Sequence, residues 1–347
     1  MTFSSPGPRP GTSCVPASAD TRRTRHILVC GGAGYIGAHA AYALAQQGFE
    51  VSVLDNLSTG HREALRWGRW IDADLLQPQS LDAAFARPVD AVMHFCARSL
   101  VGESVIAPYD YYDNNVVGSL NLLRVMHRHG VGKLVFSSSA AVFGHPIGER
   151  IDEAHPKAPI NPYGASKLMV ERILADAAQA YGLRSVSLRY FNAAGAAAEA
   201  GIGESHDPET HLIPNVIRAG LGQGGALNVF GDDYGTTDGT CVRDYVHVLD
   251  LADAHIRALD WMDGNEGAHC FNLGNDAGFS VLQVIRAASQ VMGRDIEYRV
   301  LPRRHGDPAV LVASSQAARV HLGWTPRYTG IERIIESAYR WHRDPGF

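Results

Sequence analysis

The sequence predicts an α/β fold, a doubly wound parallel sheet with helices on both faces and a smaller C-terminal lobe. Two observations predict it. From residue 25 to residue 192, short apolar runs of β-type residues alternate with amphipathic helical stretches, which is the pattern of βαβ units. Between the first run and the first helix lies a glycine-rich turn, Gly-Gly-Ala-Gly-Tyr-Ile-Gly at residues 31–37. This combination is typical of a Rossmann-type domain.

The expected elements follow one another in a regular order. Six strands are expected in the first part of the chain, at residues 26–30, 50–54, 70–73, 89–95, 133–137 and 185–189. The main helices between them are expected at residues 36–47, 108–129 and 162–181. Residues 193–241 are Gly-rich and irregular, and helices are expected at residues 214–222, 249–262, 281–292 and 331–341. We therefore expect a flexible tail at 1–24, a sheet domain at 25–192 to which some later segments return, and a lobe formed mainly by 193–347.

The composition narrows the class of protein. The chain has 347 residues, 46% of them hydrophobic and 19% charged, a globular balance that excludes wholesale disorder. A net charge of −5 does not favour a nucleic-acid or an anionic membrane partner. No apolar run reaches the roughly 18 residues that a membrane span needs. Arg22 and Arg23 precede an apolar stretch, but that stretch is better explained as the first strand than as part of an export signal.

The cysteines and histidines indicate neither a disulfide framework nor a metal site. The cysteines are odd in number and form no Cys-x-x-Cys pair. They are Cys14, Cys30, Cys96, Cys241 and Cys270. A reducing cytoplasm is the simplest compartment for them. The sixteen histidines are scattered and form no His-Glu-x-x-His motif, so we expect no bound metal.

The glycine-rich turn predicts a dinucleotide site. Residues without Cβ allow backbone amides to approach a pyrophosphate at a helix N-terminus. Asp55 ends the second expected strand, where its carboxylate would accept hydrogen bonds from ribose hydroxyls and repel a 2′-phosphate. The sequence therefore predicts NAD rather than NADP as the cofactor of residues 25–192.

A second group of residues predicts catalysis. Tyr163 and Lys167 are four residues apart at the start of an expected helix, so they share one helical face. A phenol with a pKa near 10 is a poor base at neutral pH unless a cation stabilises its phenolate, and Lys167 would supply that charge. Ser139 ends the fifth expected strand and could hydrogen-bond the same substrate oxygen.

Together these motifs make the chain resemble the extended short-chain dehydrogenase/reductases, the NAD-dependent epimerase/dehydratase family. Within them it looks like the UDP-glucose 4-epimerases. The resemblance runs from about residue 26 to the C-terminus and includes five further motifs. They are Val-Gly-Glu-Ser at 101–104, Tyr-Tyr-Asp-Asn-Asn at 111–115, Tyr-Phe-Asn at 190–192, Val-Arg-Asp-Tyr-Val-His at 242–247 and Arg-Arg-His-Gly-Asp at 303–307.

The resemblance implies a role for each matching position. Besides Lys167, the implied NAD site comprises Gly31, Gly34, Tyr35, Ile36, Gly37, Asp55, Asn56, Asp74, Leu75, Phe95, Ala97, Asn114 and Phe191. Besides Ser139 and Tyr163, the implied UDP-sugar site comprises Asn192, His211, Phe230, Arg243, Arg304 and Asp307. For the arginines there is also a direct physical reason, because guanidinium groups bind a diphosphate bidentately.

The activity implied is the interconversion of UDP-galactose and UDP-glucose by transient oxidation at C4, with Tyr163 as the base. UDP-xylose/UDP-arabinose and UDP-N-acetylglucosamine are alternative substrates. A 4,6-dehydratase would carry an Asp-Glu pair after the strand-five hydroxyl residue, where this chain has Ala140 and Ala141. A non-catalytic NAD-binding regulator would typically lack the Tyr/Lys pair.

Three positions depart from the family's best-known bacterial pattern. Ser99 stands where a lysine often contacts the cofactor, and Phe143 replaces a tyrosine. Leu311 occupies the position that gates the size of the sugar pocket, and a leucine there leaves the choice of sugar open. The resemblance also implies a homodimer, paired through the helices expected at 108–129 and 162–181.

Overall fold

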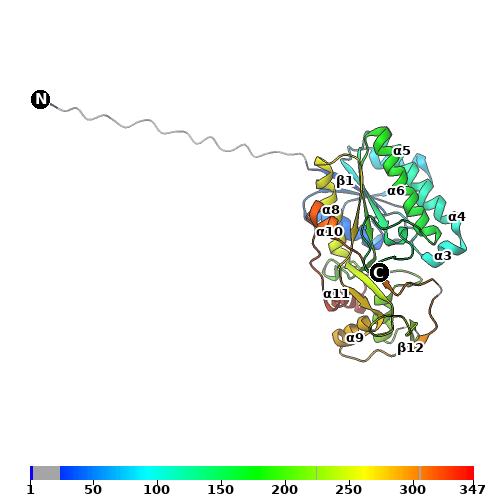
Figure 1. Cartoon of the computed structure of the whole chain (residues 1–347). Coiled ribbons are helices and arrows are strands. Elements are labelled where there is room, and N and C mark those ends of the chain that lie inside the picture. Colours follow the sequence, from blue (N-terminus) through cyan, green and yellow to red (C-terminus); the bar gives the residue numbers. More distant parts are fainter. Residues whose placement is uncertain (3–23, 224, 305) are drawn as a thin grey trace.

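The structure is a computed structural model that describes residues 1–2, 24–223, 225–304 and 306–347. Its main element is a sheet of seven parallel strands (Figure 1). In spatial order the strands are β10 (Ala268–Leu273), β6 (Arg184–Tyr190), β5 (Lys133–Ser139), β4 (Ala91–His94), β1 (His26–Cys30), β2 (Glu50–Asp55) and β3 (Arg69–Asp72). The order reverses between β1 and β4, which is the switch point of a doubly wound sheet.

Helices cover both faces of this sheet. They are α1 (Tyr35–Gln46), α8 (Val248–Gly264) and α10 (Gln316–Leu322) on one face and α5 (Gly118–Arg128) and α6 (Pro162–Tyr181) on the other (Figure 1). Strand β1 shows why both faces are needed. Its side chains alternate, with Ile27 and Val29 packed in one apolar cluster and Leu28 and Cys30 in the other. Because neither face of the strand can meet water, its sequence is a continuous apolar run.

The predicted fold class is confirmed, and several expected elements have the predicted bounds, such as β1 and α6. The seventh strand of the sheet was not among the six expected strands. It is β10, which pairs with β6 at the edge of the sheet, with Phe271 opposite Leu188. The run that forms β10 reads Ala-His-Cys-Phe-Asn-Leu. Because it contains His269 and Asn272, it differs from the continuous apolar runs of the expected strands.

The helix expected at residues 108–129 is not uniform. It begins as α4 (Pro108–Tyr111), passes through the π-helical segment η3 (Tyr112–Val117) and continues as α5. A further helix, α3 (Val101–Ile106), precedes it. Widened helical turns are frequent at functional sites, and this one contains the paired asparagines of the Tyr-Tyr-Asp-Asn-Asn motif.

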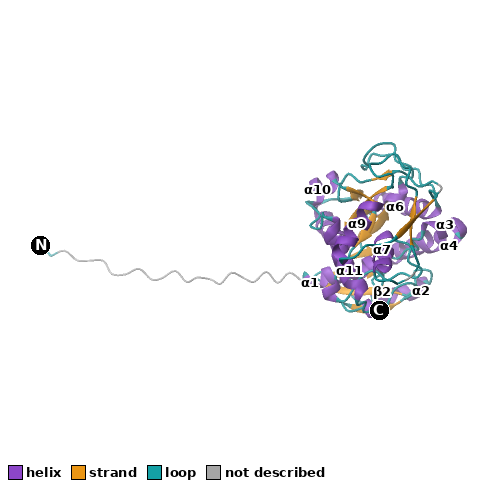
Figure 2. Ribbon diagram, turned by 90° about the horizontal axis from the view of Figure 1, so that it is seen from below, coloured by secondary structure: helices purple, strands orange, loops and turns teal. Residues whose placement is uncertain are grey.

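The smaller lobe has its own sheets and core. Strands β11 (Gly278–Ser280), β9 (Val242–His247) and β13 (Val310–Leu311) lie side by side, and β7 (Asn192–Ala194) also pairs with β9. A second, two-stranded sheet joins β8 (Leu227–Phe230) to β12 (Tyr298–Leu301). Helices α7 (Leu212–Gly220), α9 (Val281–Met292) and α11 (Ile331–Arg343) pack on one another around this core (Figure 2).

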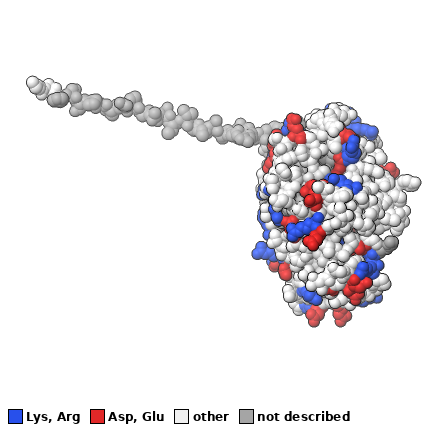
Figure 3. Space-filling view, viewed as in Figure 1, with Lys and Arg blue, Asp and Glu red and all other residues white. Residues whose placement is uncertain are grey.

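Short elements complete the chain. They are η1 (Arg62–Ala64), α2 (Pro78–Leu81), η2 (Asp82–Phe85), η4 (Ala140–Val142) and η5 (Ala198–Ala200). Among the described residues, no helix is both long and apolar enough to cross a membrane. Acidic and basic side chains lie interspersed on the face seen in Figure 3. Cys14, Arg22 and Arg23, with nearly all of the predicted tail, lie outside the described residues.

Candidate active site

The glycine-rich turn lies at the carboxyl end of β1, beside the switch point of the sheet. Gly31 has a φ of 82°, a left-handed value that favours glycine. A Cβ at Gly37 would lie 2.1 Å from the carbonyl oxygen of Gly31, so no larger residue fits there. At Gly34, by contrast, a Cβ would meet no described atom closer than 3.5 Å. Two glycines therefore close the turn, and the third leaves space beside α1 for a ligand.

The amino end of α1 is suited to an anion. Its first turn contains no acidic residue, and no side chain of the described residues caps its N–H groups. Such free N–H groups, together with the helix dipole, attract phosphate. Tyr35 and Ile36, both predicted to contact the cofactor, are the first residues of this helix. The Tyr35 hydroxyl donates a hydrogen bond of 2.6 Å to the carbonyl oxygen of Gly195.

Asp55 supports the turn from the end of β2. Its carboxylate accepts hydrogen bonds from the backbone N–H groups of Ala33, at 2.9 Å, and Leu57, at 2.8 Å. Burial raises the pKa of Asp55, and these two hydrogen bonds oppose the shift. Asn56 donates a hydrogen bond of 3.1 Å to Asp74, so three of the predicted cofactor residues meet at one place. This cluster of oxygens fits ribose hydroxyls and disfavours a 2′-phosphate.

The other residues predicted for the cofactor follow strands at the same carboxyl edge or lie on the helices beside it. Leu75 follows β3 and is buried, while Phe95 and Ala97 follow β4 and are partly buried. Asn114, in η3, donates a hydrogen bond of 2.9 Å to the side chain of Asn115. Phe191 follows β6. The residues present thus fit NAD, because the turn, the free helix end and the carboxylate cluster match its pyrophosphate and ribose.

Tyr163 and Lys167 lie in the first turns of α6. Asn161 caps this helix by accepting a 2.8 Å hydrogen bond from the N–H of Gly164. The Lys167 ammonium is buried, donates a 2.7 Å hydrogen bond to the carbonyl oxygen of Ser137 and lies 5.8 Å from the centre of the Tyr163 ring. Burial lowers the pKa of Lys167 to about 7.

Ser139 joins this pair from the end of β5. Its hydroxyl accepts a 3.1 Å hydrogen bond from the N–H of Ala141 and is hydrogen-bonded to the phenol of Tyr163. Burial raises the pKa of Tyr163, and the hydrogen bond with Ser139 opposes this shift. The effect of Lys167 on the phenol stays a prediction. The three predicted catalytic residues are thus brought together, with a hydroxyl and a phenol facing one position.

The residues predicted to bind the sugar nucleotide meet in pairs within the smaller lobe. Arg243 forms a 2.5 Å ion pair with Asp307. The guanidinium of Arg304 lies 4.0 Å from the centre of the Phe230 ring. Asn192 donates a 2.8 Å hydrogen bond to the carbonyl oxygen of Asp244, beside Arg243. Two arginines and an aromatic ring are suited to a nucleoside diphosphate.

A match to a family profile decides the family. The profile of the NAD dependent epimerase/dehydratase family matches residues 27–274, well over half of the chain. The chain belongs to the NAD-dependent epimerase/dehydratase family. The predictions of this family and of NAD as cofactor are confirmed.

Relatives within the epimerase/dehydratase family resemble the chain over nearly its whole length. The UDP-glucose 4-epimerase of Halalkalibacterium halodurans is 50% identical over 321 residues, 92% of this chain and 96% of the relative. The structure of the Brucella ovis UDP-glucose 4-epimerase with NAD is 44% identical, with a TM-score of 0.89 over 91% of this chain and 98% of that one. A Stenotrophomonas maltophila UDP-glucose 4-epimerase, with NAD and formylated UDP-arabinopyranose, is 39% identical, with a TM-score of 0.89 over 92% and 98%.

Two features that hold the catalytic helix of this family's site in place were not predicted from the sequence. Asn115 is buried, accepts a hydrogen bond from the N–H of Arg98 and donates to the hydroxyl of Ser166 on α6. It therefore connects the loop after β4 to the catalytic helix. The doubled asparagine of the Tyr-Tyr-Asp-Asn-Asn motif was a signal, but only Asn114 was given a role. A sequence does not tell which of two neighbouring helical residues faces inward when the helix widens.

The second missed support is an ion pair between α6 and β6. Glu171 and Arg189 are almost fully buried, 2.6 Å apart, and Ser138 donates a further 2.6 Å hydrogen bond to Glu171. The pair fastens the helix that carries Tyr163 to the sheet. Charged residues in apolar strands and helices were the available signal, because a buried charge needs a partner.

Two of the three positions that depart from the family's pattern, Phe143 and Leu311, lie at one small apolar cluster. Phe143 is buried in it, and Leu311 and Phe191 pack against it from the side. Leu311 stands opposite Arg243 on the neighbouring strand, so it lies between the predicted cofactor and sugar residues. Ser99 is exposed.

One residue predicted for the sugar nucleotide is engaged elsewhere. The ring of His211, at the amino end of α7, contacts the carboxylates of Glu204 and Glu209 rather than the arginine pairs. Its role in the epimerase/dehydratase site stays a prediction.

Proposed function

We propose that the chain is a UDP-glucose 4-epimerase, which interconverts UDP-galactose and UDP-glucose with NAD. The observation that carries the proposal is the meeting of Ser139, Tyr163 and Lys167 next to the glycine-rich turn. Both lie at the carboxyl edge of the parallel sheet, because Ser139 ends β5 and the turn follows β1, and only β4 separates these two strands. Relatives of 46% to 50% identity, matched over nearly their full length, bear this activity in their names.

The chain's own residues move one proton. Tyr163, as phenolate, accepts the proton of the sugar 4-hydroxyl while Ser139 holds the same oxygen by a hydrogen bond. The positive charge of Lys167 stabilises the phenolate. Bound NAD would supply the hydride acceptor for C4 and then the donor that restores it, so that no net oxidation would occur. After the 4-keto sugar has turned over in the pocket, Tyr163 gives its proton back and the configuration at C4 is inverted.

The same geometry argues against the dehydratase reaction. Elimination of water across C5 and C6 needs an additional acid and base beside the sugar. The residues that directly follow Ser139 are Ala140 and Ala141, which begin η4. Their methyl groups have no proton that can be transferred, so these positions cannot supply the acid and base of a dehydratase.

Arg243 and Arg304 would hold the UDP group while the sugar turns. Both come from the smaller lobe, and in the structure each has a neighbour that orients it, Asp307 and Phe230 respectively. Guanidinium groups can bind a diphosphate with two parallel hydrogen bonds each. An anchor at the diphosphate leaves the sugar ring free to present either face to the cofactor.

UDP-xylose and UDP-arabinose form the second candidate substrate pair. The related Stenotrophomonas maltophila enzyme was solved with a formylated UDP-arabinopyranose, which favours a pentose as an additional substrate here. Leu311 is smaller than the tyrosine that would close the pocket, so UDP-N-acetylglucosamine is also to be tested.

NMR of the purified protein tests these proposals. With UDP-galactose and no added NAD, UDP-glucose should appear and reach equilibrium, because the cofactor is retained. Parallel tubes with UDP-arabinose and UDP-N-acetylglucosamine decide the sugar range. If only UDP-arabinose is converted, the proposed mechanism stands, but the substrate is the pentose rather than UDP-galactose. No conversion of any sugar, even with NAD supplied, would overturn the catalytic role of Tyr163.

We also propose that the chain forms a homodimer through α3, α4 and α6. Large apolar side chains are exposed on these helices and the adjoining π-helical segment: Val105, Ile106, Tyr109, Val117 and Met169. Exposed apolar patches of this kind mark contact sites. A second copy of the chain is the expected occupant, and light scattering should give twice the 37.5 kDa chain mass. A Tyr109→Glu variant should be monomeric, and a monomeric parent would contradict the proposal.

We propose a cellular compartment for the protein from the state of its cysteines. The four described cysteines, Cys30, Cys96, Cys241 and Cys270, are free thiols. Free thiols persist in a reducing compartment, so we propose that the protein works in the cytoplasm.

A further inference from the structure

Four side chains capable of binding a metal converge in the loop between η5 and α7. They are Glu204, His206, Glu209 and His211, and one ligand atom from each lies within 4.8 Å of all the others. All four lie in the eight-residue segment 204–211, which reads Glu-x-His-x-x-Glu-x-His. This spacing differs from the His-Glu-x-x-His motif, which the chain lacks.

The contacts among these four side chains cannot all be ordinary hydrogen bonds. The Nδ1 atom of His211 lies 2.7 Å from Glu204 and 2.9 Å from Glu209. A ring nitrogen carries at most one proton, so it can donate to only one of these carboxylates. The Nδ1 atom of His206 lies 3.2 Å from the same oxygen of Glu204. Two nitrogens and two carboxylates thus point at one position.

Glu209 adds an independent observation. Its side chain is 1% exposed, and its Oε2 atom is buried without a hydrogen-bond partner among the described residues. This oxygen lies 4.0 Å from the Nδ1 atom of His206. A buried carboxylate oxygen without a partner is costly, and a cation between it and the imidazole would satisfy it.

We infer that Glu204, His206, Glu209 and His211 bind one divalent transition-metal ion, with zinc as the expected occupant. Ligands at about 2.1 Å from a tetrahedral ion lie about 3.4 Å from one another, within the range of the contacts here. Imidazole nitrogen and carboxylate oxygen are both zinc ligands. Two carboxylates and two neutral imidazoles neutralise a dication.

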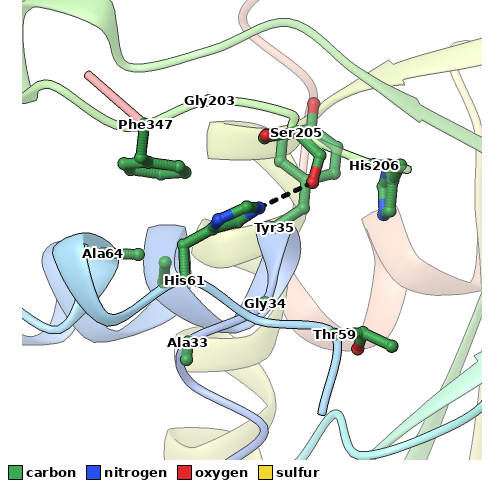
Figure 4. Close-up of a pocket in the computed structure, with 11 residues that line it drawn as sticks. Ala33, Gly34, Tyr35, Thr59, His61, Ala64, Gly203, Ser205, His206 and Phe347 are labelled. Atoms are coloured by element: carbon green, nitrogen blue, oxygen red, sulfur yellow. Dashed lines mark hydrogen bonds between the residues drawn. The ribbon is translucent and has the colours of Figure 1, made fainter. Parts of the chain in front are cut away.

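The place of the cluster in the fold indicates a structural role. His206 lies beside Tyr35, the first residue of α1, with ring centres 6.3 Å apart (Figure 4). The carbonyl oxygen of Glu204 accepts a 2.8 Å hydrogen bond from Trp341 of α11, and His211 stands at the start of α7. The ion would hold in one conformation a loop that contacts α1 and α11 and leads into α7. His211 is also predicted for the UDP-sugar site, but the inference is tested by metal content and does not depend on the proposed epimerase activity.

The alternative is that a proton on His211, rather than a metal ion, holds the cluster together. Although burial lowers the pKa of His211, its hydrogen bonds to Glu204 and Glu209 raise it to about 10. An imidazolium would therefore balance one carboxylate charge. It would not give the Oε2 atom of Glu209 a partner.

Metal analysis of untagged protein separates the two accounts. After dialysis against metal-free buffer, we expect about one zinc ion per chain, and a zinc absorption-edge spectrum with imidazole and oxygen neighbours and no sulfur. Glu209→Gln and His206→Gln should each lower the zinc content at least fivefold and reduce the Tm. The matched variants Glu199→Gln and His145→Gln, at exposed positions, should keep both.

Several outcomes would overturn the inference. Protein that takes up no zinc from micromolar solutions would leave the proton as the occupant. Zinc that remains stoichiometric in Glu209→Gln, or a spectrum with sulfur neighbours, would place the ion elsewhere. If the variants do not fold, the spectrum of the unmodified protein still decides, together with the change in Tm on chelation by dipicolinate.

Discussion

At the level of single residues, the chemistry depends on the phenol of Tyr163, whose pKa is shifted in opposite directions by burial and by a hydrogen bond. Burial raises the pKa of Tyr163, whereas the hydrogen bond with Ser139 lowers it. Lys167 adds a buried ammonium 5.8 Å from the ring. The sequence could predict this trio, because residues four apart, such as Tyr163 and Lys167, share one face of any α-helix. It could not predict that Ser139 is the contact which opposes the effect of burial.

We expect Tyr163→Phe to lower kcat by at least about 100-fold, since a positioned general base contributes about 10² to 10⁴. The fold should be unchanged, as phenylalanine fills nearly the same volume. Tyr181→Phe, at the exposed end of the same helix, is the control and should keep full activity. The coupled assay of UDP-glucose formation measures both, and equal rates in the two variants would remove Tyr163 from the mechanism.

At the scale of elements, α6 is placed by a close approach to η4. A Cβ at Gly164 would lie 2.3 Å from the carbonyl oxygen of Ala141. A glycine in the Tyr-Gly-Ala-Ser-Lys motif was visible in the sequence, but the element that it approaches was not. Contacts between segments distant in the chain depend on how a whole layer packs, which local patterns do not specify.

The Gly164→Ala variant should shift α6 and separate Tyr163 from Ser139. We expect a fall in kcat of at least about 100-fold, since small displacements of catalytic groups have effects of this order. A lower Tm should accompany it. Gly132→Ala is the control, because a Cβ there meets no atom of the described residues within 4 Å. If Gly164→Ala keeps its activity, the close approach does not position the base.

The ion pair between α6 and β6 predicts a coupled pair of variants. Arg189→Met should lower the free energy of unfolding by about 3–5 kcal/mol, because the carboxylate of Glu171 is left buried without its partner. The double variant Glu171→Met/Arg189→Met should recover much of this loss. Urea denaturation of the three proteins measures the effect. A double variant less stable than Arg189→Met would contradict this explanation.

At the scale of the whole molecule, the sequence predicted the layered fold but not how the chain returns to it. Residues beyond 192 were expected to contribute some segments to the first domain, yet β10 was not identified as one. Its run is interrupted by His269 and Asn272, and the buried Asn272 is accommodated by a hydrogen bond to the carbonyl oxygen of Ile151, 121 positions away. The Arg243–Asp307 pair likewise joins residues 64 positions apart. Such long-range pairings carry no local signal.

Several histidines in the interior couple stability to pH. Burial lowers the pKa of His255 to about 4 and that of His39 to about 4. Because the unfolded chain takes up these protons near pH 6.5, stability is complete above that pH and is lost as the pH falls towards 4. From pH 7.5 to 5.5, each such histidine should cost about 1.4 kcal/mol.

Urea denaturation at these two pH values tests this coupling with His255→Gln. The loss of stability on acidification should be about 1.4 kcal/mol smaller in the variant than in the parent. His145→Gln, at an exposed position, should leave the loss unchanged. An identical loss in all three proteins would show that His255 is not held neutral.

In the proposed reaction, C4 of the sugar is oxidised and reduced again within one closed site. UDP-galactose labelled with deuterium at C4, in ordinary water and without added NAD, shows whether this happens. We expect UDP-glucose that retains the label at C4, because the hydride never reaches solvent, while Tyr163→Phe gives almost no product. Loss of the label to water, with inversion still occurring, would contradict hydride transfer and with it the assigned role of the Ser139, Tyr163 and Lys167 trio.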